Sequence, residues 1–583
     1  MRKTVIGVAA LVLAAGVTVQ VAAWSASTSS PTFDTSTLAG KVASVHGTAG
    51  LQIRMSAFAE QEAEPSNPAD VLGPDGVSLI EPGGGSVKAP DTTVNQDTAA
   101  APQNETSIAV DPNRPDRIVA GANDYVTRTW SCTVGGTPCS ALGDGYSGTY
   151  YSNDGGKTWC CSASDPQHLG TLIPGVSHLA GGPYDAGGDP AVAFDSRGAV
   201  YYAGLGFNRN SAPNTVTVNR GTFGTSGGLS WSQPTFINPT TSPAVFNDKE
   251  WIAADWHASS RYRDRVYVTW TRFLFNSQNG NYVQSPIFEA HSTDGGATFS
   301  APQSISGNVL YDQGSRVFTG ADGTVYAVWE GATRLSTLDG TYFAKSTDGG
   351  VTWSKPALVA TLVDFDGIKD TAFRVNSFPA GAVAPNGTLY ASWTTDESDR
   401  AVVVYSTSTD GGAHWSAPVH VPGVDVARTP VGYAGTGLTP PAARPAESIW
   451  PSVTVSPTGK VFIGAYVGDV VSPWQSCATY DPKGSVNCQT TGPLVNNTKL
   501  DYVVTDLSSG VTGTATTQSI NTRYQFRGGF IGDYTDMSAG SDGVAHPFWT
   551  DTNNAQHVSW WYGSNFGDLL VSQQDVVTTR VTY

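Results

Sequence analysis

Charged and hydroxyl side chains recur beside short apolar stretches of this chain, although only 14% of its residues are charged. Some stand just before an apolar stretch: Glu105, Asp189, Asp248, Lys249, Glu250, Arg316, Arg374, Glu447, Arg527, Asp533 and Tyr534. Others stand just after one: Asp124, Arg272, Glu330, Asp396, Asp469 and Asp551. Carboxyl, guanidinium and phenol groups gathered in one place could carry out acid–base chemistry or bind a polar ligand. Such chemistry requires a scaffold that brings these scattered positions together.

Seven pairs of short strands would supply that scaffold. Each pair has an apolar strand, a polar turn and a second strand rich in Val, Tyr or Trp: residues 107–111 with 118–121, 190–194 with 200–203, 251–254 with 266–270, 316–318 with 325–329, 381–384 with 389–393, 452–455 with 461–464, and 537–539 with 544–549. Strand pairs repeated in this way, with Gly and Asp turns, are typical of β-propeller blades. The charged positions would then meet around the propeller axis, on one face.

The number of pairs predicts an all-β protein with seven propeller blades. A six-bladed ring with one extra hairpin is the alternative. The last pair is short of strands, and residues near 95–103 are available to complete that blade and close the ring.

The chain divides into three predicted parts. Residues 1–23 are expected to be an export signal, because Arg2 and Lys3 precede an apolar run that ends at Ala23. The alternative for this segment is an uncleaved membrane anchor. Residues 24–100 are of low complexity, which favours a mostly disordered segment, and residues 101–583 form the propeller. We therefore expect a secreted, extracellular and monomeric protein.

A phrase of eight residues occurs four times, at 152–159, 292–299, 346–353 and 408–415, and a fifth copy at 225–231 has lost its Asp. Each full copy reads Ser-x-Asp-Gly-Gly, then ends in Trp or Phe. The Asp carboxylate can accept backbone N–H groups, and the glycines supply positive φ. The aromatic residue can pack beneath the turn. The phrase therefore predicts a hairpin turn that is anchored to the core of its blade.

This phrase resembles the Asp-box, or BNR repeat, of sialidases and other secreted β-propellers. The resemblance implies that each copy joins the third and fourth strands of a blade, on the edge that faces away from the active site. A structural role is thus expected for the phrase itself. The Arg-Ile-Pro signature of sialidases is absent, since Arg117-Ile118-Val119 lies within a strand pair.

The resemblance further implies an exo-glycosidase of the sialidase type, acting on extracellular glycans. Such enzymes bind the carboxylate of the sugar through three arginines and cleave with an Asp acid and a Tyr nucleophile that is activated by a Glu. The candidates for substrate binding are Arg272, Arg316, Arg374, Arg527 and Asp189. The candidates for catalysis are Asp248 as acid, with Asp189 as its alternative, and Tyr534 as nucleophile with Glu250 or Glu447 as base.

A propeller that binds a glycan or a surface without turnover is the competing hypothesis. Neither function requires a cofactor. A structural Ca²⁺ is a further possibility, because Glu105, Asp189, Glu447 and Asp533 could provide hard oxygen ligands in the central pit.

The six cysteines are expected to form disulfides, since an even number in an exported chain favours them. Cys477 and Cys488 would close a small loop. Cys160 and Cys161 would each pair with one of Cys132 and Cys139. No Cys-x-x-Cys pattern supports the alternative of a zinc site.

The formal net charge of −17 disfavours nucleic acids and anionic membranes as partners, because both need a positive protein surface. An extracellular glycan or glycoconjugate is therefore the expected partner.

Overall fold

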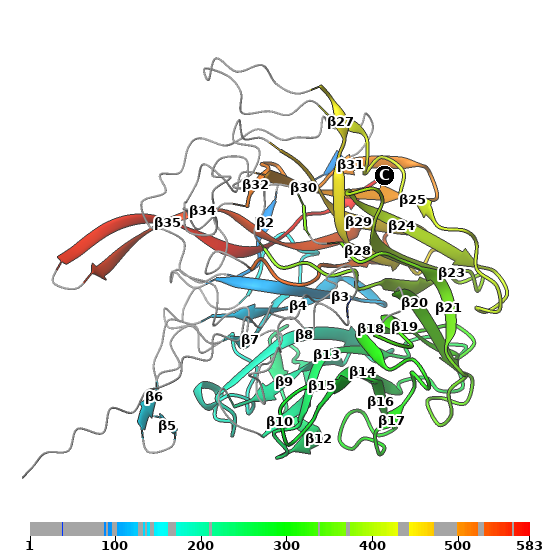
Figure 1. Cartoon of the computed structure of the whole chain (residues 1–583), viewed down its shortest axis with the longest axis horizontal. Coiled ribbons are helices and arrows are strands. Elements are labelled where there is room, and N and C mark those ends of the chain that lie inside the picture. The colour runs from blue at the N-terminus through cyan, green and yellow to red at the C-terminus, as the bar shows by residue number, and fades with distance from the viewer. Residues whose placement is uncertain are drawn as a thin grey trace, which may run out of the picture.

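The computed structural model describes Leu38, residues 87–88, residues 91–95 and residues 102–583, except for 126–131, 135–136, 140–144, 161–170, 209–212, 336–338, 366, 369–372, 429–441, 471–497, 523–529 and 563–564. The described part is an all-β propeller of seven blades (Figure 1). This confirms the predicted fold class and the seven-bladed count. No helix of the described residues is long and apolar enough to cross a membrane.

Each blade is an antiparallel sheet whose strands follow one another outward from the axis. Blades 1 to 3 contain β3 (Gln103–Asp111), β4 (Arg114–Asp124) and β7 (Tyr146–Ser152); β8 (Ala186–Phe194), β9 (Val200–Phe207), β10 (Asn214–Phe223), β11 (Leu229–Trp231) and β12 (Thr235–Thr240); and β13 (Val245–Ala254), β14 (Val266–Phe275), β15 (Tyr282–Gln284), β16 (Ile287–Ser292) and β17 (Gln303–Ser304). Blades 4 and 5 contain β18 (Tyr311–Thr319), β19 (Val325–Ala332), β20 (Gly340–Ser346) and β21 (Ala357–Thr361); and β22 (Ala380–Val383), β23 (Leu389–Asp396), β24 (Ala401–Ser408) and β25 (Val419–His420). Blades 6 and 7 contain β28 (Glu447–Val455), β29 (Val461–Val470), β30 (Thr498–Asp506), β31 (Val511–Thr514) and β32 (Ile520–Asn521); and β33 (Asp536–Ala539), β34 (Ala545–Tyr562), β35 (Asn565–Thr578), β36 (Val581–Thr582), β1 (Val87–Lys88) and β2 (Thr92–Thr93).

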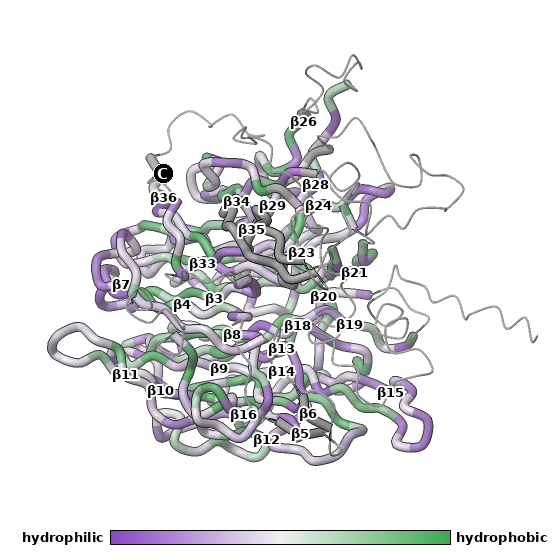
Figure 2. Tube along the Cα trace, turned by 90° about the vertical axis from the view of Figure 1, so that its left-hand side faces the viewer, coloured by the Kyte–Doolittle hydropathy of each residue, from purple (hydrophilic) through white to green (hydrophobic). Residues whose placement is uncertain are grey.

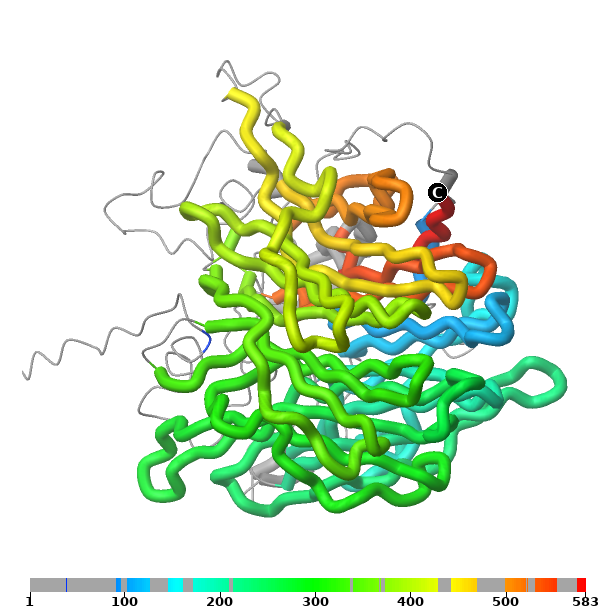
Figure 3. Tube along the Cα trace, turned by 90° about the vertical axis from the view of Figure 1, so that its right-hand side faces the viewer, coloured from blue at the N-terminus to red at the C-terminus, as the bar shows by residue number. Residues whose placement is uncertain are grey.

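The innermost strands form a closed ring around the axis. In chain order, β3, β8, β13, β18, β22, β28 and β33 each contact the next one, and β33 contacts β3 again. The orange and red strands of blade 7 accordingly lie beside the blue strands of blade 1 (Figure 3). All seven innermost strands begin on the same side of the propeller. The residues at their first positions therefore lie around the common axis on that side.

Residues from near the beginning of the chain complete blade 7. Strand β2 pairs with β35, β1 pairs with β36, and the backbone N–H of Val94 donates to Val576 at 2.8 Å. The closing residues thus lie at 87–95, just before the stretch expected from the sequence, because Gln103 already begins β3 of blade 1. These two strands lie inside the segment 24–100, where the composition favours disorder; most of that segment falls outside the described residues.

Large aromatic side chains wedge between the blades. Trp270, Trp329, Trp393 and Trp549 occupy matching positions in the second strands of blades 3, 4, 5 and 7, and each is fully buried. Each Trp packs in a hydrophobic cluster that also contains residues of the preceding blade, so these side chains fill the space between neighbouring blades. Hydrophobic segments follow the strands, and hydrophilic ones gather in the turns at the edge (Figure 2).

The repeated turns, as we call residues 152–159, 292–299, 346–353 and 408–415, fold alike. In the second of them, the Ser292 hydroxyl donates to Asp294 at 2.8 Å, and Asp294 accepts the backbone N–H and the hydroxyl of Thr298 at 2.9 and 2.6 Å. Each turn follows the third strand of its blade, and three of them lead directly into the fourth strand. The carboxylates are thus satisfied within the turn, as the sequence predicts, on the face opposite to the starts of the innermost strands.

Several sequence-based predictions fall on residues whose side chains are not described. These include the export signal, Arg527, and five of the six cysteines. The backbone of Cys132 lies opposite that of Cys139 in a small hairpin of β5 (Cys132–Val134) and β6 (Thr137–Cys139), and Cys160 is disulfide-bonded. The pairing of the remaining cysteines stays a prediction.

Candidate active site

A bulge recurs at the same place in five of the innermost strands. The pairing with the second strand shifts there in blades 1, 2, 3, 4 and 6. The residues at the shift have left-handed φ angles: 53° at Glu105, 53° at Asp189, 50° at Lys249, 68° at Gly314 and 49° at Trp450. That conformation costs a residue with a side chain about 1–2 kcal/mol. A bulge re-aims its side chain, and in three of these strands the re-aimed side chain is charged: Glu105, Asp189 and Lys249.

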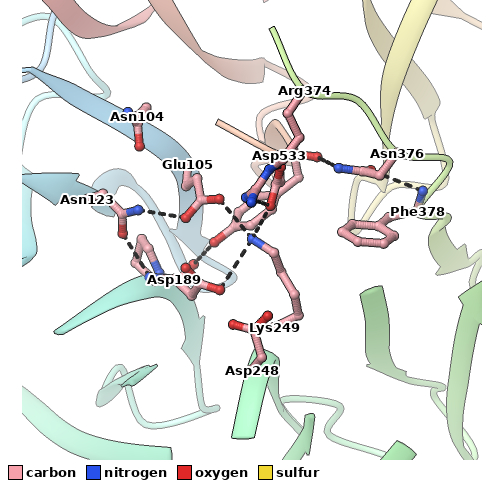
Figure 4. A network of polar contacts seen from close by, with 12 residues as sticks. Asn104, Glu105, Asn123, Asp189, Asp248, Lys249, Arg374, Asn376, Phe378 and Asp533 are labelled. Carbon is pink, nitrogen blue, oxygen red and sulfur yellow. Dashed lines mark hydrogen bonds and ion pairs between the residues drawn. The ribbon is translucent and has the colours of Figure 1, made fainter. Parts of the chain in front are cut away.

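Three of these bulge residues, Glu105, Asp189 and Lys249, meet on the axis. Together with Arg374 and Asp533, which precede β22 and β33, they form what we call the hub (Figure 4). The Lys249 ammonium lies 2.8 Å from Glu105 and 2.9 Å from Asp533. It lies 3.3 Å from Asp189. Arg374 holds Asp533 from the other side through two bonds, of 2.9 Å at Nε and 2.5 Å at Nη2. Three blades and two linkers between blades therefore contribute to a single network of ion pairs.

Two amides fix the orientation of the hub carboxyl groups. The Asn123 amide donates to Glu105 Oε2 at 2.6 Å, and its oxygen accepts the backbone N–H of Asp189 at 2.8 Å. The Asn376 amide donates to the backbone oxygen of Asp533 at 2.9 Å. Glu105, Asp189, Lys249 and Asp533 are all buried. The hub is thus held rigidly before any ligand arrives, which is the condition that an active site needs.

Arg316 closes the axis beneath the hub. Its guanidinium crosses from blade 4 to blade 7, where it donates to Thr535 O at 2.6 Å and to Asp536 at 3.2 Å. It lies 3.9 Å above the ring of Trp251. On the far side of Arg316, a cavity of about 230 Å³ is lined by residues from all seven innermost strands. Arg316 therefore separates this axial cavity from the hub.

The environment drives the pKa values of the hub carboxyl groups apart. Burial, followed by the charge of Asp189, raises the pKa of Asp248 to about 7. Burial and Asp189 also raise the pKa of Glu105 and of Glu250 well above their usual range. For Asp533 burial acts in the same direction, but Arg374 and Lys249 outweigh it and lower the pKa to about 2. Protonated and ionised carboxyl groups thus coexist in one site, the arrangement that acid–base catalysis uses.

Tyr534 and Glu250, the predicted nucleophile and one of its two candidate bases, both line a small pocket beside the axis, and no hydrogen bond joins them. The Tyr534 hydroxyl donates to Pro190 O at 3.4 Å, and its ring meets that of Trp251 edge-on, with centroids 5.8 Å apart. Burial and then the charges of Glu105, Asp189 and Glu250 raise the pKa of Tyr534 well above its usual range. This environment keeps the phenol protonated, which is opposite to what a phenolate nucleophile requires.

The described arginines that were predicted to bind substrate already contact other side chains of the protein. Arg374 is paired with Asp533 and Arg316 with Asp536. Arg272, near the end of β14, places its guanidinium 5.0 Å from the ring centre of Phe288. Arg527 lies outside the described residues. The structure therefore brings Arg316 and Arg374 to the axis, each with a protein carboxylate as partner.

The structure gathers Asp189, Asp248, Glu250, Tyr534 and Arg374 at or beside the hub. Glu447 is buried at the start of β28 in blade 6. Sequence reasoning placed Lys249 among the ring residues but gave it no role, and it missed Asn123 and Asp536. The signal for Lys249 was its place between two acids, since a lone lysine among buried carboxyl groups is expected to pair with them.

The predicted Ca²⁺ site can be compared with the positions of the carboxyl groups that would hold the ion. The Lys249 ammonium occupies the point between Glu105, Asp189 and Asp533, so a Ca²⁺ held by these three residues would have to displace it. A second group of buried carboxyl groups, Glu330, Asp339 and Asp364, has oxygens within 4.8 Å of one another. Hydrogen bonds from Leu38 N to Asp339 and from Ser377 to Asp364 contribute to that group.

No protein-family model and no curated protein matches the chain. Solved structures that are similar to it include the α-L-arabinofuranosidase Arb93A from Fusarium graminearum, with 11% identity, a TM-score of 0.36, and coverage of 67% of this chain and 92% of that one. They also include the Hadza microbial sialidase Hz136, with 11% identity, a TM-score of 0.38 and coverage of 88% and 98%. A third is the intramolecular trans-sialidase from Ruminococcus gnavus, with 14% identity, a TM-score of 0.33 and coverage of 87% and 98%. Likeness this distant carries no functional argument, so function is argued from the hub.

Proposed function

We propose that the protein is a secreted glycoside hydrolase that acts on extracellular glycans. One observation carries this proposal: two buried carboxyl groups, Asp533 in the hub and Asp248 beside it, have opposite pKa shifts, with Asp248 at about 7 and Asp533 at about 2. Cleavage of a glycosidic bond needs one carboxyl group that protonates the leaving oxygen and another that stays ionised beside the sugar ring. Asp248 is assigned the first role, and Asp533 the role of stabilising the positive charge of the transition state.

The pH dependence follows from the protonated form of Asp248. A general acid is most effective when its pKa lies near the working pH. We expect kcat/KM to be highest where Asp248 is protonated and to fall as the pH rises through about 7. The repeated strain at the hub supports the same assignment, because strained backbone that is retained in several blades points to a functional demand.

The sugar is proposed to be neutral. The sialidase-like form of the proposal needs arginines for a substrate carboxylate, but Arg374 and Arg316 are bonded to Asp533 and Asp536. An acidic sugar would have to displace these carboxylates, whereas a neutral sugar would leave both ion pairs in place. The likeness of the repeated turns to the Asp-box supports glycans as the substrate class, and a sialoside is the alternative substrate.

A binding propeller without turnover is the second candidate function. It is favoured by the burial of the hub and by the raised pKa of Tyr534. Ligand contacts would then come from the hub face, and none of the carboxyl groups would transfer a proton.

A panel of aryl glycosides separates these functions. We expect release of the aryl group from a neutral glycoside, with Asp248→Asn lowering kcat/KM by about 10²–10⁴-fold. Asp294→Asn makes the same substitution in a repeated turn and should retain full activity. Turnover of the sialoside that is lost in Arg374→Met would favour the sialidase-like form. Glycan binding without release from any member of the panel would favour the binding propeller.

Export is a further part of the proposal and has its own test. The basic and apolar start of the chain favours removal of residues 1–23. Amino-terminal sequencing of protein recovered from the culture medium should then begin near Trp24. Protein that stays with the membrane fraction and begins at its original terminus would instead support an anchor.

A further inference from the structure

The axial cavity of about 230 Å³ lies on the opposite side of Arg316 from the hub. The last residues of six innermost strands line it, namely Phe194, Ala254, Thr319, Val383, Val455 and Ala539. Pro112 and Pro457, which lie beyond the ends of β3 and β28, line it as well. Because the hub lies at the starts of the innermost strands, the cavity extends to the other face, where the repeated turns lie.

The walls of the axial cavity are mostly apolar. Ala193, Phe318, Val383 and Val455 line this space, and they are only half-buried although they belong to the innermost strands of the ring. An apolar cavity of about 150 Å³ is already large enough to hold benzene. The axial cavity can therefore accept an aromatic or branched aliphatic group that carries one polar substituent.

The inner end of the cavity is polar, because Arg316 and Asp536 line it. Arg316 is only 8% exposed, and it uses two of its five N–H groups: Nη1 donates to Asp536 at 3.2 Å, and Nη2 donates to Thr535 O at 2.6 Å. Among the residues that the structure describes, none accepts from the remaining three. A buried guanidinium with spare N–H groups at the end of an apolar cavity can donate to an oxygen atom of a ligand.

The charges at this end of the cavity are balanced. Asp536 pairs with Arg316 through one oxygen, and its other oxygen accepts from the Ser107 hydroxyl at 3.2 Å and from the Ile108 N–H at 3.0 Å. An anionic ligand would have to compete with Asp536 for the guanidinium, and the net charge of −17 opposes it further. We propose that the axial cavity is a second binding site, for a small neutral molecule with an apolar body and a carbonyl oxygen that accepts from Arg316. This site does not depend on the function proposed for the hub.

Three matched probes test the chemistry of the ligand: benzamide has a neutral carbonyl oxygen, toluene has no oxygen, and benzoate has a charged carboxylate. In a ligand-observed NMR titration, benzamide should bind in the millimolar range or tighter, as expected for so small a molecule. Toluene should bind about tenfold or more weakly because it lacks a hydrogen bond to a charged donor, and benzoate should bind about as weakly because Asp536 repels it. No binding of benzamide, or binding of either other probe that is as tight, would overturn the proposal.

Substitutions test whether the probe occupies this cavity. Ala193→Phe fills the space and should weaken benzamide binding by about tenfold or more. Ala297→Phe adds the same group at an exposed position of a repeated turn on the same face, and it should leave the affinity unchanged. R316M combined with D536N removes both charges together and leaves no buried charge unpaired, so benzamide should then bind no better than toluene. Benzamide binding that survives Ala193→Phe unchanged would overturn the proposal.

A crystallographic test uses the unaltered protein and decides the question even if the cavity variants do not fold. Crystals soaked with 4-bromobenzamide should contain a bromine anomalous peak in the axial cavity, with the amide oxygen within hydrogen-bonding distance of Arg316. A bromine peak only at lattice contacts, or no peak, would overturn the proposal. A peak in the cavity without any benzamide binding in solution would mean binding at crystal concentration only, and would overturn it as well.

Discussion

The two faces of the propeller use the same kind of side chain in opposite ways. In the repeated turns, Asp294 has its carboxylate satisfied by residues of its own turn, Ser292 and Thr298. Hydrogen bonds from Thr298 lower the pKa of Asp294. At and beside the hub, Glu105 and Asp248 are buried, and each accepts from another blade: Glu105 from Lys249 and Asp248 from Gln313. Burial raises the pKa of both.

The two faces therefore differ in where the hydrogen-bond partners of a carboxyl group come from: from its own turn on one face, and from distant parts of the chain on the other. A carboxylate that already accepts three hydrogen bonds within its own turn, as Asp294 does, has little capacity left for a ligand. A carboxyl group whose partners come from distant parts of the chain depends on the whole ring, and its protonation responds to each of them. Chemistry is therefore expected at the hub, and the repeated turns are expected to stabilise their blades.

The largest effect expected from this comparison is the loss of the hub cation. Lys249→Met leaves buried carboxyl groups without their ammonium partner, and removing one member of a buried ion pair costs about 3–5 kcal/mol. Urea unfolding should reveal this loss. Lys157→Met, in the first repeated turn, removes an exposed lysine and should change the free energy of unfolding by less than about 0.5 kcal/mol. Equal effects at the two lysines would contradict the comparison.

The second prediction concerns the response of each face to pH. Asp248 has a raised pKa in the folded protein, so its contribution to stability is full at low pH and is lost as the pH rises from 3.8 to about 7. The carboxylates of the repeated turns have lowered pKa values, so their contribution is lost as the pH falls. Melting temperatures measured across this range should decline less steeply toward pH 7 in Asp248→Asn than in the unaltered protein. An unchanged slope would place Asp248 in a solvated environment.

A smaller effect is expected when a repeated turn loses its carboxylate. Asp294→Ala removes the acceptor for Thr298 and should cost on the order of 1 kcal/mol, as the loss of a comparable capping side chain does. Asp294→Asn keeps one acceptor oxygen and should cost less. Chemical unfolding measures both variants, and the kinetics of the hub should be unchanged in each. A loss of turnover in Asp294→Ala would mean that the two faces are coupled.

The smallest effect is expected where one repeated turn differs from the rest. His414 stands in place of the usual Thr, and its ring nitrogen lies 2.7 Å from Asp410. His414→Thr supplies the hydroxyl that makes the equivalent bond in the other three turns, and both residues are exposed. The midpoint of thermal unfolding near neutral pH should therefore not change measurably. A clear drop would assign the histidine a contact beyond its own turn.

The propeller could be predicted from the sequence because its signals are local. Repeated strand pairs gave the seven blades, and Asp-Gly-Gly with its flanking hydroxyl residues gave the turns. The position of the closing strands was less predictable. Strands β1 and β2 have two residues each, and nothing in so short a stretch distinguishes it from its polar surroundings.

The hub could be predicted only in part. Position relative to the strands identified Asp189, Asp248 and Tyr534, because residues at strand starts on one face meet at the axis. The partners of the arginines could not be predicted, since Arg316 reaches Asp536 across 220 residues of sequence. Left-handed bulges at Glu105 and Lys249 have no sequence signature either, because most left-handed positions are marked by glycine and these are not.

The closure of blade 7 has a consequence for how the molecule is made. Residues 92–94 pair with β35, and Asn95 bonds to Asp575 at 2.9 Å, so the ring is sealed by segments that are synthesised almost 500 residues apart. Until β35 and β36 leave the ribosome, β1 and β2 lack the strands with which they pair. An incomplete chain thus exposes unpaired strand edges and an unfinished centre, and both are resolved in one late step that joins the two ends of the chain.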